Sequence, residues 1–157
     1  MTATGLLPCE TIRSCSDAGK HYAGPANASA RDALSVYLND DPGEGPTYGF
    51  YMENNAAAKA VFDAWLEPLR DLGMKKNVIG AIGNTDHLSF TGLGLPGFTT
   101  IKDYVGYDTR THHTNADYYE RVTEADLRQS AIVMAVFAYH AAMREQNIPR
   151  VPVSKNP

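Results

Sequence analysis

Residues 33–52 determine the type of fold, and they read Ala33-Leu-Ser-Val-Tyr-Leu-Asn-Asp-Asp-Pro-Gly-Glu-Gly-Pro-Thr-Tyr-Gly-Phe-Tyr-Met52. The run Ala33–Asn39 is short and mostly apolar, which predicts a strand. Asp40–Gly45 is a strong turn signal because Pro and Gly favour turn conformations. Thr47–Met52 is rich in aromatic β-formers and predicts a second strand. Two strands joined across such a turn indicate an antiparallel hairpin.

A helix is expected directly after the second strand, over Ala56–Leu72. Asn54 or Asn55 supplies its N-cap, and Gly73 ends it. Pro68 removes one backbone hydrogen bond, so we expect a kink there. Apolar side chains recur at intervals of three and four residues, which indicates one buried face: Val61, Trp65, Leu69 and Leu72.

Three short elements and a loop are expected in the middle of the chain. Val78–Ile82 fits a strand and Thr85–Leu93 fits a short helix. Gly97–Ile101 fits another strand, whereas residues 103–122 show no clear period and fit a long loop.

A long helix is expected from Glu124 to about Gln146. Thr123 is its N-cap, and Asp126 occupies the third helical position, close to a capping box. The stretch Ala131–Met143 is so apolar that we expect it to be buried on most sides. The alternation of strands and helices predicts an α/β domain, with a mixed β-sheet flanked by helices.

The composition is that of one globular domain, with 157 residues, 43% of them apolar and 20% charged. We divide the chain into a loose leader over 1–30, a domain over 31–150 and a tail over 151–157. The net charge of −4 argues against nucleic acid or a membrane surface as partner. No apolar run approaches the ~18 residues that span a bilayer. No signal peptide is visible, so the sequence leaves the compartment open.

Two pairs of adjacent residues, Asp40-Asp41 and Asp86-His87, could take part in metal binding or catalysis. Asp40 and Asp41 lie where the first strand meets the turn, where a carboxylate can ligate a metal. The composition alone favours a role in the turn itself. The carboxylate of Asp86 could orient the imidazole of His87. Alternatively, Thr85 or Asp86 could be the N-cap of the following helix.

A histidine pair lies in the polar loop segment Thr111–Asp117. His112 and His113 are adjacent, and the Thr, Asn and Asp residues around them can support metal ligands through hydrogen bonds. A catalytic or metal role and a structural role are about equally supported here. A group of tyrosines has two interpretations, a pocket lining or a packed loop: Tyr104, Tyr107, Tyr118 and Tyr119. The sequence contains no phosphate-binding loop, nucleophile elbow or His-Glu-x-x-His motif.

Taken in order, these segments resemble the motifs of the two-zinc exopeptidases. Tyr37–Gly45 resembles their Asn-x-Asp-x-Gly-x-Gly segment, and Gly83–Phe90 resembles their Ser/Thr-Asp-His-x-x-Phe segment, followed by Gly94–Gly97. Thr111–Asp117 resembles their His-Thr/Ser-x-x-Asp segment, and its doubled histidine is similar to the branch that includes plasma glutamate carboxypeptidase. The resemblance covers about residues 33–150.

The resemblance implies a mixed sheet between helices, and a site in which two zinc ions share an Asp and a water and which releases terminal residues from peptides. Asp41 would be a ligand of one zinc and His113 a ligand of the other. His112 would lie beside the transition-state oxyanion, and Asp86 and His87 beside the substrate cleft. Proteins of this family are often secreted or periplasmic.

The chain departs from the family upstream of the Asn-x-Asp segment. Family members carry a His-x-Asp motif and a Glu-Glu pair there, which supply the other ligands and the general base. In residues 1–40 His21 is followed by Tyr22-Ala23, and no Glu-Glu pair occurs anywhere. The resemblance therefore implies the C-terminal part of a catalytic domain, in which zinc binding is weak or absent.

Three functions stay open. The first is a zinc-dependent aminopeptidase or carboxypeptidase, incomplete in this chain, with a peptide as substrate. The second is a catalytically inactive α/β module that binds a peptide or a protein. The third is a single-metal site built from Asp41, His113 and His87. Because a missing half would leave an open sheet edge and uncovered apolar surface, we also expect a homo-oligomer or a complementing N-terminal half as partner.

Overall fold

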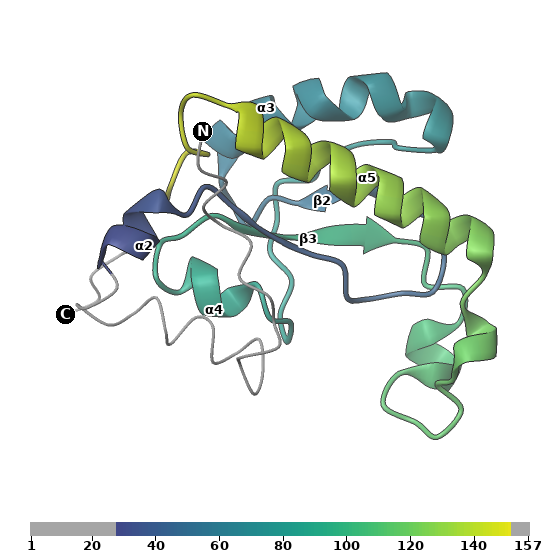
Figure 1. Ribbon diagram of the computed structural model, residues 1–157. Helices are drawn as coiled ribbons and strands as arrows, with labels where there is room; N and C mark the ends of the chain where they lie inside the picture. The colour runs from purple at the N-terminus through teal and green to yellow at the C-terminus, as the bar shows by residue number, and fades with distance from the viewer. Residues whose placement is uncertain (1–27, 152–157) are drawn as a thin grey trace.

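The computed structural model describes residues 28–151, so most of the predicted leader and tail, residues 1–27 and 152–157, lies outside the described residues. The chain forms an α/β domain in which a mixed sheet is flanked by helices, which confirms the predicted fold class (Figure 1). The elements are α2 (Ala28–Ala33), β1 (Tyr37–Asn39), β2 (Thr47–Tyr51), α3 (Ala56–Leu66), η3 (Glu67–Leu72), α4 (Leu88–Thr91), β3 (Gly97–Lys102), η4 (Tyr107–Thr111), η5 (Tyr119–Arg121) and α5 (Glu124–Met143).

The predicted hairpin is wrong, because β3 lies between β1 and β2 in the sheet. β1 runs parallel to β3, whereas β2 runs antiparallel to it. The turn between β1 and β2 wraps around the end of β3, where Gly45 N donates to Asp103 O and Asp103 N donates to Pro46 O. The first strand is also shorter than expected, because Ala33 ends helix α2 and only Tyr37–Asn39 is extended.

The strand expected over Val78–Ile82 is reduced to a single bridge, in which Val78 pairs with Tyr51 of β2. The segment before it still covers the outer edge of β2, since Lys75 N donates to Tyr48 O at 2.7 Å. This close approach requires a glycine in the strand. A Cβ on Gly49 would lie 1.8 Å from the carbonyl oxygen of Lys76.

The predicted helix over residues 56–72 is divided at the proline. Asn55 is the N-cap and accepts from Ala58 N, and the α-helical part ends at Leu66. A tighter 3₁₀ segment then begins at Glu67, because Pro68 has no backbone N–H to continue the α-helical hydrogen bonds. Gly73 ends the segment in the left-handed conformation, with φ of 93°.

Two other helices also differ from expectation. The helix expected over Thr85–Leu93 is confined to α4, and the long loop expected over 103–122 contains the short turns η4 and η5. Helix α5 begins at its predicted N-cap, where Thr123 Oγ1 accepts from Asp126 N. The expectation that α5 is buried on most sides is wrong, because much of its apolar content is alanine on the outer side. Its buried residues form one face: Ser130, Val133, Phe137 and Ala141.

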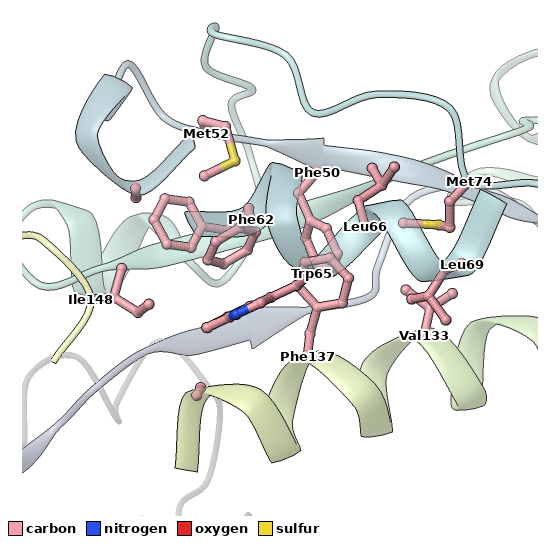
Figure 2. Packing of buried hydrophobic residues seen from close by; sticks show 13 residues of the cluster. Phe50, Met52, Phe62, Trp65, Leu66, Leu69, Met74, Val133, Phe137 and Ile148 are labelled. Carbon is pink, nitrogen blue, oxygen red and sulfur yellow. The ribbon is translucent and has the colours of Figure 1, made fainter. Parts of the chain in front are cut away.

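The main core lies between the sheet and the two long helices, α3 and α5, which pack side by side (Figures 1 and 2). The Phe62 ring is at its centre, with ring centroids 4.7 Å from Phe98 and 5.2 Å from Phe137. Alternation along β3 turns Gly97 to the opposite face, toward His87 and Phe90. No helix among residues 28–151 is long and apolar enough to cross a membrane.

Candidate functional site

Three consecutive polar residues at the end of β1 have different environments. Asn39 is buried and donates from Nδ2 to Thr99 Oγ1 at 3.2 Å. Asp40 accepts from Thr100 Oγ1 at 2.6 Å and lies 3.4 Å from Lys102 Nζ. Asp41 is exposed at the start of the turn. The carboxylate of Asp40 is therefore engaged by β3, whereas that of Asp41 is available at the surface.

The histidine pair follows the π-helical turn η4 and continues a stack of aromatic rings. Tyr104 stacks on Tyr107 with centroids 6.1 Å apart, and Tyr107 stacks on His112 at 4.8 Å. The rings of His112 and His113 are 4.0 Å apart, and both residues are exposed. His113 adopts a left-handed conformation with φ of 57°, which is uncommon for a residue with a side chain.

A hydrogen bond ties this turn to the turn after β1. Thr111 is 1% exposed, and its hydroxyl donates to the Glu44 carboxylate. Thr111 directly precedes the histidine pair, and Glu44 is the third residue after Asp41. The contact therefore holds together the two segments that carry the predicted metal ligands, across the end of the sheet.

The pKa of Tyr107 depends on its burial and on nearby carboxylates, including Asp41. Burial raises the pKa of the Tyr107 phenol above 10.0, and the negative charges of Asp41, Asp117 and Asp108 raise this pKa further. The negative charge of Asp41 therefore acts on a ring that stacks on His112.

The remaining two predicted site residues differ sharply in exposure. Asp86 is exposed, and its backbone carbonyl accepts from Ser89 N. His87 is 0% exposed, with Nδ1 3.2 Å from Thr85 Oγ1 and Nε2 3.0 Å from Glu53 Oε1. The structure therefore stacks His112 and His113 next to Tyr107, whose pKa the charge of Asp41 raises, but holds His87 inside the domain.

The described residues do not form a complete zinc site. Asp41 and His113 offer the oxygen and nitrogen donors that zinc accepts, but catalytic zinc uses about three protein ligands. In the range 28–151, no three His, Cys, Asp or Glu side chains are close enough together to hold a metal ion. The donor types fit zinc and their number does not, so we derive no catalytic step through a metal.

The sequence analysis did not identify Glu44, Glu53 or Thr111 as important. Glu44 was considered only as part of a predicted turn, and Thr111 only as the residue before the histidine pair. Glu53 carries no local pattern, because its partners, Ile82 N and His87, lie far along the chain. A hydrogen bond across the fold leaves no signal in local sequence spacing.

Comparison with solved structures finds a similar fold. The chain is similar to the crystal structure of a peptidase M28 precursor from Shewanella amazonensis SB2B, with a TM-score of 0.69 and 26% sequence identity. The match covers 85% of this chain and 30% of that chain, so the chain spans less than a third of the similar protein. No model of a protein family matches the chain, and no curated protein matches it.

Proposed function

We propose that the chain is part of the catalytic domain of a zinc-dependent exopeptidase, which hydrolyses terminal peptide bonds. The stacking of His112 and His113 next to Tyr107, together with the effect of the Asp41 charge on the pKa of Tyr107, is the observation that supports this proposal. The similarity to the peptidase M28 precursor supports the same class of hydrolase.

In this proposal each residue has a separate role. Asp41 would hold one zinc ion and His113 another, and bound zinc would supply an activated water. His112 presents a ring N–H to the oxyanion of the substrate. Asp86, which is exposed, would contact the substrate. The other ligands and the general base would come from a complementing N-terminal half.

A second function has its own support in the structure. The absence of three grouped potential ligands within residues 28–151 favours an inactive module that binds a peptide or a protein. The two functions differ in zinc dependence. A peptidase requires zinc at Asp41 and His113, whereas a binding module holds a peptide equally well in the presence of a chelator.

Zinc titration of the purified chain, followed by NMR, tests the proposed ligands. We expect weak binding that shifts the signals of Asp41 and His113, because few preformed ligands remain. Asp41→Ala should remove the shifts. Asp40→Ala is the matched control and should retain them, because Thr100 and Lys102 already engage that carboxylate. Nanomolar affinity would contradict the two-zinc assignment and favour the single-metal site.

Peptides with blocked ends test the exopeptidase assignment. In the presence of zinc and of a complementing N-terminal half, we expect a peptide with both ends blocked to remain intact, while a peptide with one free end loses its terminal residue. The preferred free end distinguishes aminopeptidase from carboxypeptidase. Peptide binding without cleavage, unchanged by a chelator, would instead support the inactive binding module.

A further inference from the structure

A chain of buried polar contacts leads from β1 to the loop after β2. Asn39 Nδ2 donates to Thr85 Oγ1, which lies 3.2 Å from His87 Nδ1. On the other side of the ring, Nε2 lies 3.0 Å from Glu53 Oε1. The side chains of His87 and Glu53 are only 0% and 7% exposed, so water does not replace these contacts.

The donors and acceptors along this chain have one consistent direction. Glu53 Oε1 accepts from Ile82 N at 3.1 Å and lies 3.0 Å from Nε2, so its negative charge favours a ring proton on Nε2. In this neutral tautomer Nδ1 carries a lone pair and accepts from the Thr85 hydroxyl, whose oxygen accepts from Asn39 Nδ2. Glu53 lies off the direction of an ideal hydrogen bond from Nε2, so this last contact is a short electrostatic one.

The contacts end at the strand that presents Asp41. Asn39 is the last residue of β1 and pairs with Thr99 in the sheet register. Its side-chain amide is held by Thr85 and Thr99, and its backbone carbonyl accepts from Thr99 Oγ1 at 3.5 Å. Asp41 follows two residues later, where the chain leaves the sheet. Fixing Asn39 therefore limits where the Asp41 carboxylate can lie.

We propose that His87 is a positioning residue, held as the Nε2–H tautomer between Glu53 and Thr85, which fixes Asn39 and through it Asp41. The assignment of Asp41 rests on the proposed function, whereas the tautomer and the placement of Asn39 do not. In this role the imidazole acts from inside the domain and has no contact with the substrate.

NMR of the imidazole nitrogens tests the tautomer. In a two-bond ¹H–¹⁵N spectrum at pH 7.5, we expect a protonated Nε2 and a bare Nδ1 for His87. His87→Gln assigns the signals, and His140→Gln is the control because His140 stacks on Trp65, on a different element. If His87→Gln does not fold, the signals that change in Thr85→Val make the assignment. A protonated Nδ1, or protons on both nitrogens, would overturn the proposal.

Two substitutions of one residue test the effect on Asn39. Thr85→Val removes the hydroxyl, so we expect a second His87 tautomer, shifted amide signals at residues 39–41, and about fivefold faster hydrogen exchange of the Asn39 side-chain amide, since one hydrogen bond is lost. Thr85→Ser retains the hydroxyl and should restore all three. Thr91→Val is the control, because Thr91 Oγ1 donates within α4 to Leu88 O. Unchanged signals in Thr85→Val would refute the positioning role.

Zinc titration of the same samples separates this proposal from the proposed function. If His87 positions Asp41, zinc-induced shifts at Asp41 weaken in Thr85→Val and return in Thr85→Ser. If zinc shifts nothing at Asp41 or His113 in the wild-type chain, the metal assignment fails. In that case the tautomer of His87 and the hydrogen-exchange rate of the Asn39 side-chain amide still show whether His87 positions Asn39 at the end of β1.

Discussion

Tyr107 provides a way to test the site at the scale of single residues without a metal. Its ring stacks on His112, and its pKa is raised by burial and by the charge of Asp41. A phenol whose pKa is higher in the folded state contributes stability that is present below pH 10.0 and is lost as pH rises through the folded-state pKa. The stability of the domain should therefore decrease in strongly alkaline solution.

The substitution Asp41→Asn should lower the pKa of Tyr107 toward 10.0, because one negative charge near the phenol is removed. The pKa is measured by ¹³C NMR of the tyrosine ring, with Tyr107→Phe as the assignment variant. Asp40→Asn is the matched control and should have little effect, since Asp40 faces Thr100 and Lys102. Equal decreases in both variants would contradict the placement of Asp41 beside Tyr107.

Sequence reasoning proposed the exposed candidate residues but not the residues that hold their segments in place. Asp41, His112 and His113 lie in segments with local patterns, a turn and a histidine pair, and these patterns drew attention to them. Their supports act over long sequence separations. Glu44 accepts from Thr111, and Glu53 contacts His87, and neither pair is adjacent in the chain. Such contacts depend on how the elements pack, which local spacing does not encode.

At the scale of elements, the edge of β2 depends on one glycine. Gly49→Ala should destabilise the domain by about 1–3 kcal/mol, since the added Cβ would overlap the carbonyl of Lys76 at 1.8 Å. Gly83→Ala is the control because a Cβ there meets nothing within 4 Å, and it should change stability by less than about 0.5 kcal/mol. Chemical denaturation measures both. Equal losses of stability in the two variants would show that the segment before Val78 moves easily to make room for the added Cβ.

The buried and exposed faces of helix α5 should differ in how much a substitution lowers stability. Phe137→Ala should cost about 3–5 kcal/mol, because the ring is 0% exposed and packs against Phe50, Phe62 and Trp65 (Figure 2). Tyr139→Ala should cost much less, because Tyr139 is 62% exposed. Thermal unfolding followed by circular dichroism compares the variants. A Tyr139 variant as unstable as the Phe137 variant would refute the burial pattern.

Local signals predicted the ends of elements well and their partners poorly. Asn55, Gly73 and Thr123 act as caps as expected, because capping depends on residues within one turn. The hairpin prediction was wrong because strand pairing depends on residues far apart in the sequence. Both β1 and β2 pair with β3 instead of with each other. The apolar content of α5 gave the wrong burial pattern, since exposed alanines have too little surface to require a partner.

At the scale of the whole molecule, we predict self-association or a complementing partner. Within the described range, β1 is an edge strand of the order β1-β3-β2, with β3 as its neighbour. Apolar side chains are also exposed along α5, including Leu127 at 58% and Met143 at 59%. Edge strands and apolar patches both favour association. Size-exclusion chromatography with light scattering should show species larger than 17.1 kDa, whereas a stable monomer that dilution leaves unchanged would contradict the prediction.

The central position of β3 has a consequence for the order in which the chain becomes structured. Both of its neighbours precede it in the sequence, so during synthesis β1 and β2 emerge before the strand that joins them. Among residues 28–151, the three-stranded sheet cannot form until residues 97–102 have left the ribosome. Pairing across such long separations must overcome the entropy of closing the intervening loops. Nascent chains that end before Gly97 should therefore remain sensitive to proteases, and protection should appear abruptly once β3 is exposed.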